Sequence, residues 1–571
     1  MNLVLELIMN ILPSYLFYGF GLFSPGHASQ VAIPGAILGV LFHATIPQVI
    51  DVDCFVYELL AVVPLVVVGF AAVCSLIGLS PFDIVIRLSV LITSFNAGLF
   101  SSMVIYRLFL HRLRRFPGPL DVKISRFFSS LRVAKDAQYY KKLARLHEEY
   151  GDFIRTGPRE ICIVRKSAVA VIYGPNSKCG KSTWYIHFQR DSKKSSLAST
   201  RDHDDHRKRR RAWDRGLSMK ALNAYAPRIK ALADTFVSQM SRQKGPVDAT
   251  AWSNYLTFDI MGSAGFGKDF GCVASGEKHP AIQAIHDHMY ILAVLSHVPW
   301  LLNLLGRLPG ATEGYVPFWD YCQSQLRAKR ANLNLEKDPE DIMSWLLKAV
   351  FEKDVSAPST KEALEEDCRA LIIAGSDTNA STLAQALFFL AKYPSVLIKL
   401  QEKIDAIMPT PADWTYEKAR SITYIDNIID ETLRLKPAVL SGVYRVTPRE
   451  GIQIDEQFIP GYTNVFVPTQ RIQTDPRYWK QATEFIPERF GERRTEMDTD
   501  SGPYIPFCAG NYSCVGKNLA IMSLRIAISS IAQHFDISFA PGETGEEFDK
   551  GAKDTFTTTL LPLMLRFSPR K

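Results

Sequence analysis

The chain has 571 residues, of which 47% are hydrophobic and 22% are charged, and its formal net charge is +8. This length exceeds what one compact core usually holds, and the apolar content excludes an intrinsically disordered protein. The charge is modest for the length and does not by itself indicate nucleic-acid binding. The nine cysteines form no C-x-x-C pair and no metal motif with histidine, which favours free thiols in a reducing compartment.

The N-terminal domain, residues 1–111, has the composition of a membrane region. Residues 59–79 form an uncharged apolar run that is long enough to cross a hydrocarbon core of roughly 30 Å, and residues 88–106 form a second run. Residues 31–50 and 3–23 are weaker candidates, because prolines interrupt the former and polar residues lie within the latter. The sequence therefore predicts two to three transmembrane helices.

Four arginines and a histidine follow the last apolar run, between Arg107 and Arg115. By the positive-inside rule they predict that residues 112–571 form a cytosolic domain. No lysine or arginine precedes Arg87, so the N-terminus lacks the basic segment of a cleavable signal peptide. The Pro117–Pro119 segment, which reads P-G-P, predicts a stiff, extended connector between the two domains.

A lysine-containing loop and a basic run invite two functional readings that we do not favour. Residues 174–183 read G-P-N-S-K-C-G-K-S-T, which is one residue too long for a phosphate-binding loop, and Pro175 lacks the N–H donor that such a loop needs.

Residues 206–211 read H-R-K-R-R-R, typical of a nucleic-acid patch. On a helix, however, His206 and Arg210 share one face, and the other basic side chains then face solvent. A solvated basic face without a partner is the plain alternative.

A long helix is predicted over residues 362–391, which contain no proline and carry apolar residues at helical spacing. Gly375 lies in its middle, at a cost of roughly 1 kcal/mol relative to alanine, which suggests that something flat or small approaches there. The hydroxyl of Thr378 can bond to the carbonyl of Ala374 and open a pocket for water or dioxygen. Asp377 beside it can relay protons.

The segment 506–520 reads P-F-C-A-G-N-Y-S-C-V-G-K-N-L-A and leads into an amphipathic helical pattern. Cys514 lies just before this helix, where unpaired N–H groups and the helix dipole favour a thiolate. A thiolate is the haem ligand that promotes cleavage of an O–O bond. Cys508 is the other candidate in the loop, but only Cys514 has Gly510 four residues before it and Gly516 two residues after it.

These motifs resemble those of the cytochrome P450 monooxygenases. Phe507, Gly510, Cys514 and Gly516 match the family's F-x-x-G-x-R-x-C-x-G, whereas Tyr512 stands where the family usually has arginine. Residues 374–378 match [AG]-G-x-[DE]-T, and further segments match the W-x-x-x-R, E-x-x-R and P-E-R-F motifs, with histidine in place of the tryptophan.

The resemblance implies a role for each matched residue. Cys514 would ligate the iron, and Asp377 and Thr378 would deliver protons. The remaining cofactor-binding positions, of which three would pair with haem propionates, are His206, Arg210, Arg445, Phe507, Gly510, Tyr512 and Gly516. A structural network would comprise Glu431, Arg434 and Arg489.

The resemblance further implies a mainly α protein with a small β region, the cytochrome P450 fold, behind an N-terminal multi-span membrane anchor. Its cofactor would be haem b, with electrons from NADPH through a flavoprotein reductase, and it would insert one oxygen atom from O2 into an apolar small molecule. The expected location is the endoplasmic reticulum membrane, with the catalytic domain in the cytosol and no nucleic-acid partner.

The wording of several segments is similar to fungal members that act in specialised metabolism, the tryprostatin hydroxylase-like group among them, and this suggests a terpenoid or alkaloid intermediate as substrate. One alternative is a haem-thiolate isomerase or dehydratase that does not use O2, although such enzymes often lack the acid–alcohol pair found here at Asp377 and Thr378. Another is a non-enzymatic haem sensor or membrane scaffold.

Overall fold

The structure is a computed structural model that describes residues 27–46, 56–187, 191–306, 308–311 and 313–570. The apolar candidate at 3–23 and the last residues of the candidate at 31–50 lie outside these ranges.

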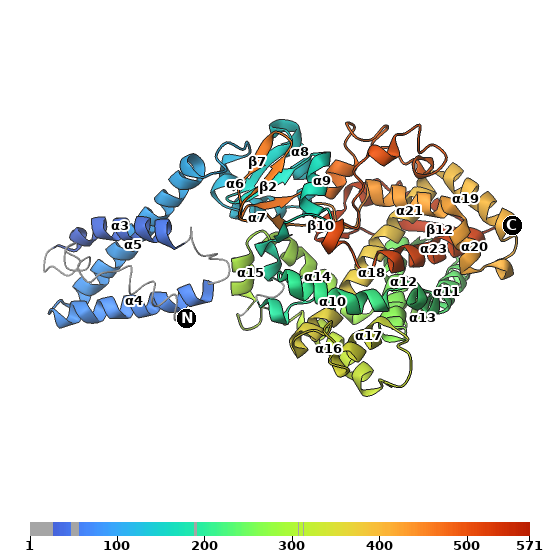
Figure 1. Ribbon diagram of the computed structural model, residues 1–571, viewed down its shortest axis with the longest axis horizontal. Helices are drawn as coiled ribbons and strands as arrows, with labels where there is room; N and C mark the ends of the chain where they lie inside the picture. The colour runs from blue at the N-terminus through green and yellow to red at the C-terminus, as the bar shows by residue number, and fades with distance from the viewer. Residues whose placement is uncertain (1–26, 47–55, 188–190, 307, 312, 571) are drawn as a thin grey trace.

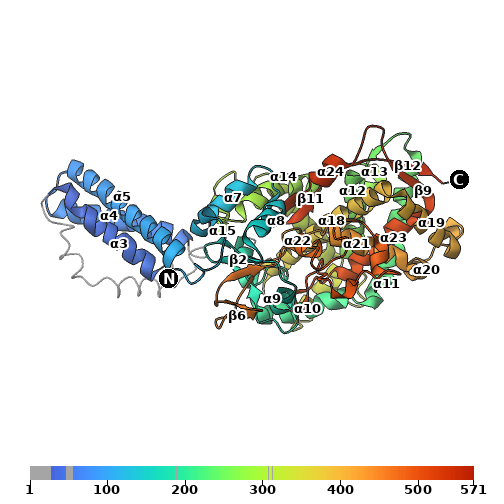
Figure 2. The ribbon, with the colours of Figure 1, turned by 90° about the horizontal axis from the view of Figure 1, so that it is seen from above.

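Within the described part of the chain, three helices near the N-terminus are long and apolar enough to cross a membrane, and they span Ala28–Thr45, Val56–Leu76 and Pro81–Leu110. They comprise η1 (Ala28–Val31) with α3 (Ala32–Thr45), then α4 (Val56–Leu76), then α5 (Pro81–Ile105) with the π-helical turn η3 (Tyr106–Leu110). These helices form a lobe that extends from one end of the molecule (Figures 1 and 2).

Glycines allow α3 and α5 to pack closely. A Cβ at Gly39 would lie 2.1 Å from the carbonyl oxygen of Phe95, and one at Gly98 would lie 2.1 Å from the carbonyl oxygen of Ala36. Small residues at a helix contact are what apolar helices use to approach within a bilayer, where apolar burial gives little driving force. The two helices therefore form one closely packed unit.

The remaining residues form a mainly α body with small sheets, as the sequence predicts. Its helices are α6 (Leu120–Ile124), α7 (Phe127–Val133), α8 (Tyr139–Tyr150), α9 (Lys166–Tyr173), α10 (His203–Gly216), α11 (Met219–Arg242), α12 (Ala249–Phe266), α13 (Cys272–Ser275), α14 (Pro280–Leu295), α15 (Pro299–Leu305), α16 (Val316–Ala331), α17 (Ile342–Phe351), α18 (Lys361–Lys392), α19 (Pro394–Ile407), α20 (Tyr416–Ser421), α21 (Thr423–Leu435), α22 (Thr469–Gln473), α23 (Lys517–His534) and α24 (Glu546–Lys550).

Short strands and 3-10 turns complete the body. The strands are β1 (Phe153–Gly157), β2 (Glu160–Ile163), β3 (Gly180–Lys181), β4 (Val247–Asp248), β5 (Arg445–Val446), β6 (Ile452–Ile454), β7 (Gln457–Ile459), β8 (Asn464–Phe466), β9 (Phe535–Phe539), β10 (Lys553–Thr555), β11 (Thr557–Thr559) and β12 (Met564–Pro569). The 3-10 turns are η4 (Thr183–His187), η5 (Ser192–Lys194), η6 (Pro411–Asp413), η7 (Pro487–Phe490), η8 (Thr499–Ser501) and η9 (Gly510–Tyr512).

The largest sheet brings together segments that are far apart in the sequence. Its strand order is β1-β2-β8-β5-β3, with β2 and β8 parallel and the other neighbours antiparallel. The short strand β3 pairs with β5, so that Lys181 lies directly opposite Arg445. The predicted connector also meets this sheet, because the Arg155 N–H donates to the carbonyl of Pro117 over 2.8 Å.

Helix α18 runs through the centre of the body (Figure 1). Its 32 residues span about 48 Å, which agrees with the helix predicted over residues 362–391. The side chain of Thr360 caps it by accepting from the Ala363 N–H. Helices α12, α16, α21 and α23 pack against α18, and these contacts hold it in place.

A buried ionic network joins α21 to the turn η7. Glu431 accepts hydrogen bonds of 2.7 and 2.8 Å from Arg434 and one of 3.3 Å from Arg489, and these side chains are fully buried. Arg434 also donates to the carbonyls of Gln473, Ala482 and Glu484. One carboxylate and two guanidinium groups therefore tie four separate segments of chain together.

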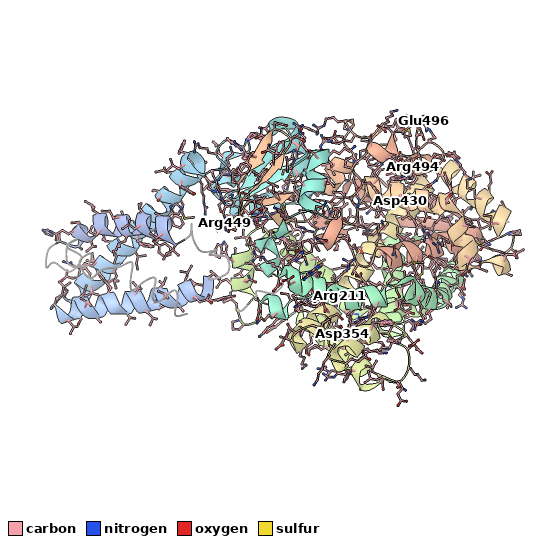
Figure 3. All side chains as sticks on the ribbon, viewed as in Figure 1. Arg211, Asp354, Asp430, Arg449, Arg494 and Glu496 are labelled. Carbon is pink, nitrogen blue, oxygen red and sulfur yellow. The ribbon has the colours of Figure 1, made fainter. Side chains whose placement is uncertain are left out.

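We predict that Arg434→Leu destabilises the protein by about 3–5 kcal/mol, because it leaves a buried carboxylate and several carbonyls without their donor. The matched control is Arg494→Leu, since Arg494 pairs with Asp500 at the surface (Figure 3), where its side chain is 50% exposed. That change should cost no more than about 0.5 kcal/mol. Urea unfolding of both detergent-solubilised variants measures the difference, and equal midpoints would contradict the prediction.

Candidate functional site

The loop before α23 is held in one conformation by Gly510. This residue has φ +61°, and a Cβ there would lie 2.3 Å from the carbonyl oxygen of Tyr173 and 2.5 Å from that of Gly174. Only glycine fits this backbone position and this contact. The Cys514 N–H then donates to the carbonyl of Phe507 over 2.9 Å, which closes the turn. The loop therefore presents Cys514 from a fixed backbone.

The thiol of Cys514 faces a cavity. The residue is accessible from the cavity, but protein atoms surround the sulfur. This burial raises the pKa of the thiol. The N–H groups of Gly516 and Lys517 and the charge of Arg210 act in the opposite direction but do not outweigh burial. The N–H groups at the start of α23 therefore favour a thiolate, as the sequence predicts, but burial has the larger effect on the pKa.

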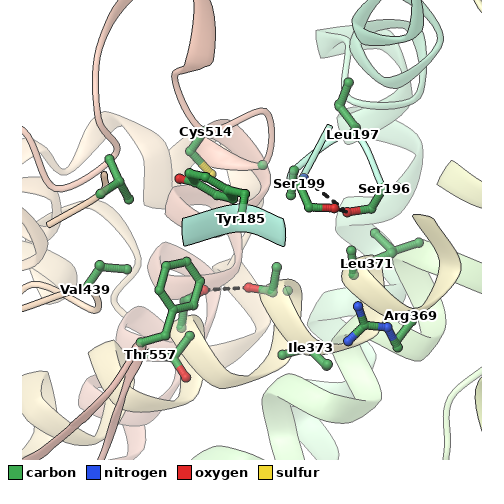
Figure 4. Close-up of a pocket in the computed structure, with 18 of the residues that line it drawn as sticks. Tyr185, Ser196, Leu197, Ser199, Arg369, Leu371, Ile373, Val439, Cys514 and Thr557 are labelled. Atoms are coloured by element: carbon green, nitrogen blue, oxygen red, sulfur yellow. Dashed lines mark hydrogen bonds between the residues drawn. The ribbon is translucent and has the colours of Figure 1, made fainter. Parts of the chain in front are cut away.

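The cavity has a volume of about 1070 Å³ and is lined mostly by apolar side chains. Figure 4 shows Cys514 and Tyr185 on one side of it and residues of α18, including Leu371 and Ile373, on another. Phe507, Cys508 and Gly516 also line it. Cys508 has φ +56°, and its sulfur accepts a hydrogen bond from Arg445 at 3.6 Å. Both loop cysteines therefore border the same space, but Cys508 already has a cationic partner.

Helix α18 contributes Thr378 to the cavity wall. The Thr378 hydroxyl donates to the carbonyl of Ala374 over 2.7 Å, the bond that the sequence predicts. Gly375 lies next to α12, and a Cβ there would lie 2.0 Å from the Cε atom of Met261. The glycine makes room for a neighbouring side chain, and both residues line the cavity.

Asp377 faces away from the cavity, toward α14. Its carboxylate is buried, and Oδ1 lies 3.9 Å from Nε2 of His286, whose side chain is 24% exposed. Burial raises the pKa of Asp377 to about 7, and burial lowers the pKa of His286 to about 4. The acid therefore lies between the cavity wall and a histidine that reaches toward the surface.

Helix α10 places two of its basic residues on the cavity. His206 and Arg210 both line it, and Arg210 donates to the carbonyl of Ser513 in the cysteine loop over 2.7 Å. Burial and neighbouring cations lower the pKa of His206 to about 3, so its ring is neutral. Arg211 is exposed on the same helix, as expected (Figure 3).

Arg209 does not face solvent, in contrast to the expectation for the rest of the basic run. It is 1% exposed and pairs with Asp367 of α18 at 2.7 Å and with Asp205 at 3.0 Å. The three-residue step from His206 brings it onto the edge of the same inward face, where α18 supplies a carboxylate. This ion pair fixes α10 against the central helix.

Three side chains from separate segments meet beside the cysteine loop. Arg445 of β5 and Lys181 of β3 lie 5.0 and 5.1 Å from the ring centroid of Tyr512, measured from the guanidinium carbon and from Nζ. His206 contacts the same ring edge-on at 4.7 Å. Lys181 is absent from the set predicted from sequence, because its closeness to Arg445 arises from a strand pairing between distant segments that no local pattern reveals.

The residues around the cavity fit a haem group. Cys514 offers a sulfur ligand, and Gly516 leaves open space beside it, since the nearest atom to an added Cβ is that sulfur at 3.9 Å. The Nε of Arg445 is buried without a hydrogen-bond partner, and Arg445 and Lys181 supply positive charge on the same side. A soft iron ligand and cations for carboxylates are the groups that haem requires.

Comparisons with known proteins agree with this geometry. The family model for cytochrome P450 matches residues 117–567. A cytochrome P450 monooxygenase of Eupenicillium brefeldianum is 39% identical, over 83% of this chain and 94% of its own length, and one of Fusarium pseudograminearum is 33% identical over 94% and 97%. Tryprostatin B 6-hydroxylase of Aspergillus fumigatus is 29% identical over 85% and 86%. The chain therefore belongs to the cytochrome P450 family of haem monooxygenases.

Proposed function

We propose that this enzyme inserts one oxygen atom from O2 into an apolar intermediate of fungal specialised metabolism, such as a terpenoid or an alkaloid. The observation that carries the proposal is the cavity itself, in which the sulfur of Cys514 and the hydroxyl-bearing wall of α18 border one largely apolar space. One relative is by its name a hydroxylase of tryprostatin B, which supports the insertion of oxygen into a small molecule. Electrons would come from NADPH through a flavoprotein reductase.

In this proposal Cys514 binds the iron of haem b, and Phe507, Gly510 and Gly516 shape the loop around it. His206, Arg210 and Arg445 hold the haem edge together with Tyr512. When bound, the haem iron supplies the activation of O2. The protein's part is to keep the sulfur in place, which the Gly510 turn does, and to hold the loop on its support. The network of Glu431, Arg434 and Arg489 provides that support.

Proton delivery falls to Asp377 and Thr378. The hydroxyl of Thr378 lies at the cavity wall. Asp377 lies on the face of α18 that is turned away from the cavity, and its pKa of about 7 lets it bind a proton near neutral pH. A carboxyl group with a pKa close to the working pH both gives up and regains a proton readily. The O2-independent isomerase or dehydratase reaction is not favoured, since it has no use for this pair.

The N-terminal helices reach the cavity through two residues. Val56 and Tyr57, at the start of α4, line it, and the Tyr57 hydroxyl donates to the carbonyl of Asn303 just within α15. An apolar substrate dissolved in the bilayer would reach the cavity beside this contact.

We place the membrane anchor at residues 1–111 and the catalytic domain at 112–571, on the cytosolic side of the endoplasmic reticulum. Exposed Arg207, Lys208 and Arg211 offer a basic face to an acidic reductase.

Cys514→Ser should abolish the thiolate-type absorbance of the reduced, CO-bound protein and reduce turnover to background, because serine offers iron no soft ligand. Cys508→Ser is the matched control in the same loop and should retain both. Absorbance spectra of the two purified variants decide the assignment. A reversed pattern would make Cys508 the ligand.

Thr378→Ala and Asp377→Asn should retain haem, while turnover of Asp377→Asn should fall on the order of 100-fold and Thr378→Ala should consume NADPH without matching product. In the wild type, product formed per NADPH should decline as the pH rises from 6 to 8, because Asp377, with a pKa of about 7, then loses its proton. Asp377→Asn should remove this dependence. Unchanged coupling in both variants would exclude these residues from proton delivery.

Protease added to intact microsomes should digest the chain from Arg112 onward, because the basic cluster before it retains this side of the membrane in the cytosol. Immunoblotting with antibodies against the catalytic domain measures the loss, and a lumenal marker that stays intact controls for broken vesicles. Full protection of the catalytic domain would contradict the proposed orientation.

A further inference from the structure

Among the described residues, no carboxylate is bonded to the buried side chain of Lys181. It is 4% exposed, and the hydrogen bond that its ammonium makes within the described residues goes to the carbonyl of Leu197, at 2.8 Å. The nearest carboxylates that act on it, Asp205 and Asp367, are already paired with Arg209. A buried ammonium held only by a neutral carbonyl is unfavourable unless an anion joins it.

Arg445 on the neighbouring strand β5 also has no carboxylate partner among the described residues. It is 2% exposed, and its guanidinium contacts the hydroxyl of Tyr185, the carbonyl of Tyr444 and the sulfur of Cys508, none of which is a carboxylate. Because Lys181 lies directly opposite Arg445 in the antiparallel pair of β3 and β5, the two side chains lie on one face of the sheet. Like charges directly opposite one another destabilise a sheet.

The ring of Tyr512 reduces this repulsion but does not neutralise it. Each cation lies about 5 Å from the ring centroid, within the range of a cation–π contact. An arginine at position 512 would place a third cation against these two and against Arg210. Tyrosine in the loop and lysine in β3 are therefore mutually consistent, whereas arginine in the loop and lysine in β3 would conflict.

We infer that Lys181 binds a haem propionate, and that it supplies from β3 the positive charge that the cysteine loop lacks at Tyr512. The pairing of charges supports this: Arg210 is paired with Asp214, whereas Lys181 and Arg445 line the cavity with no carboxylate partner among the described residues. The two carboxylates of haem match them in number and sign. The inference deepens the proposed function, and it depends on the haem site of that proposal.

The test compares haem retention in the holoenzyme. Lys181→Met removes the charge and keeps the side-chain length, Lys181→Arg keeps the charge, and Lys178→Met removes a lysine from the same loop at the surface, where it pairs with Glu450. Transfer of haem to excess apomyoglobin should be about tenfold faster in Lys181→Met, the change expected for about 1.4 kcal/mol of lost ion pairing. Lys181→Arg and Lys178→Met should match the wild type.

Two further readouts separate propionate binding from a structural role. The reduction potential of the iron should become more negative in Lys181→Met, because the lost positive charge had favoured the reduced form. Adding Tyr512→Arg to Lys181→Met should restore both haem retention and the potential, since the charge then returns from the loop. If Lys181→Met does not accumulate, recovery of holoenzyme in the double variant provides the same evidence.

Equal haem loss in Lys181→Met and the wild type would overturn the inference while leaving the haem proposal intact. So would a double variant that loses haem as fast as the single one. A wild-type protein that binds no haem would instead overturn the proposed function.

Discussion

The turn that carries Cys514 holds one sulfur atom at a fixed place beside the cavity. Gly510 makes this possible, because its left-handed backbone lets the cysteine loop lie against the carbonyls of Tyr173 and Gly174. The fully buried network around Glu431 joins α21 to η7. Gln473 links this network to the segment that leads into the loop, because its backbone carbonyl accepts from Arg434 and its side-chain oxygen accepts from the Ile505 N–H.

Charge is distributed unevenly around the cavity. The wall formed by α14 and α18 is mainly apolar, and the carboxylate of Asp377 on α18 is turned away from the space. The wall near the loop carries Lys181 and Arg445, which have no carboxylate partner among the described residues. The cationic side of the cavity therefore suits an anionic group, and the apolar side suits an apolar molecule. This arrangement matches a carboxylate-bearing cofactor next to an apolar substrate.

Local sequence patterns predicted the elements well. The proline-free stretch at 362–391 became α18, and the basic run became part of α10, because helical periodicity is a property of neighbouring residues. Contacts between distant segments were not predictable in this way. Lys181 opposite Arg445, and Met261 against Gly375, arise from a strand pairing and a helix crossing that no periodicity specifies. For the same reason the burial of Arg209 was missed, since its partner lies on another helix.

The most direct test of this account is an experimental structure of the purified, haem-loaded protein. The account predicts iron bonded to the sulfur of Cys514 within the cavity, with the haem carboxylates between Lys181 and Arg445 and the face opposite the sulfur directed at Thr378. Iron bonded to Cys508 or to no cysteine, or a haem whose carboxylates lie away from both cations, would contradict it.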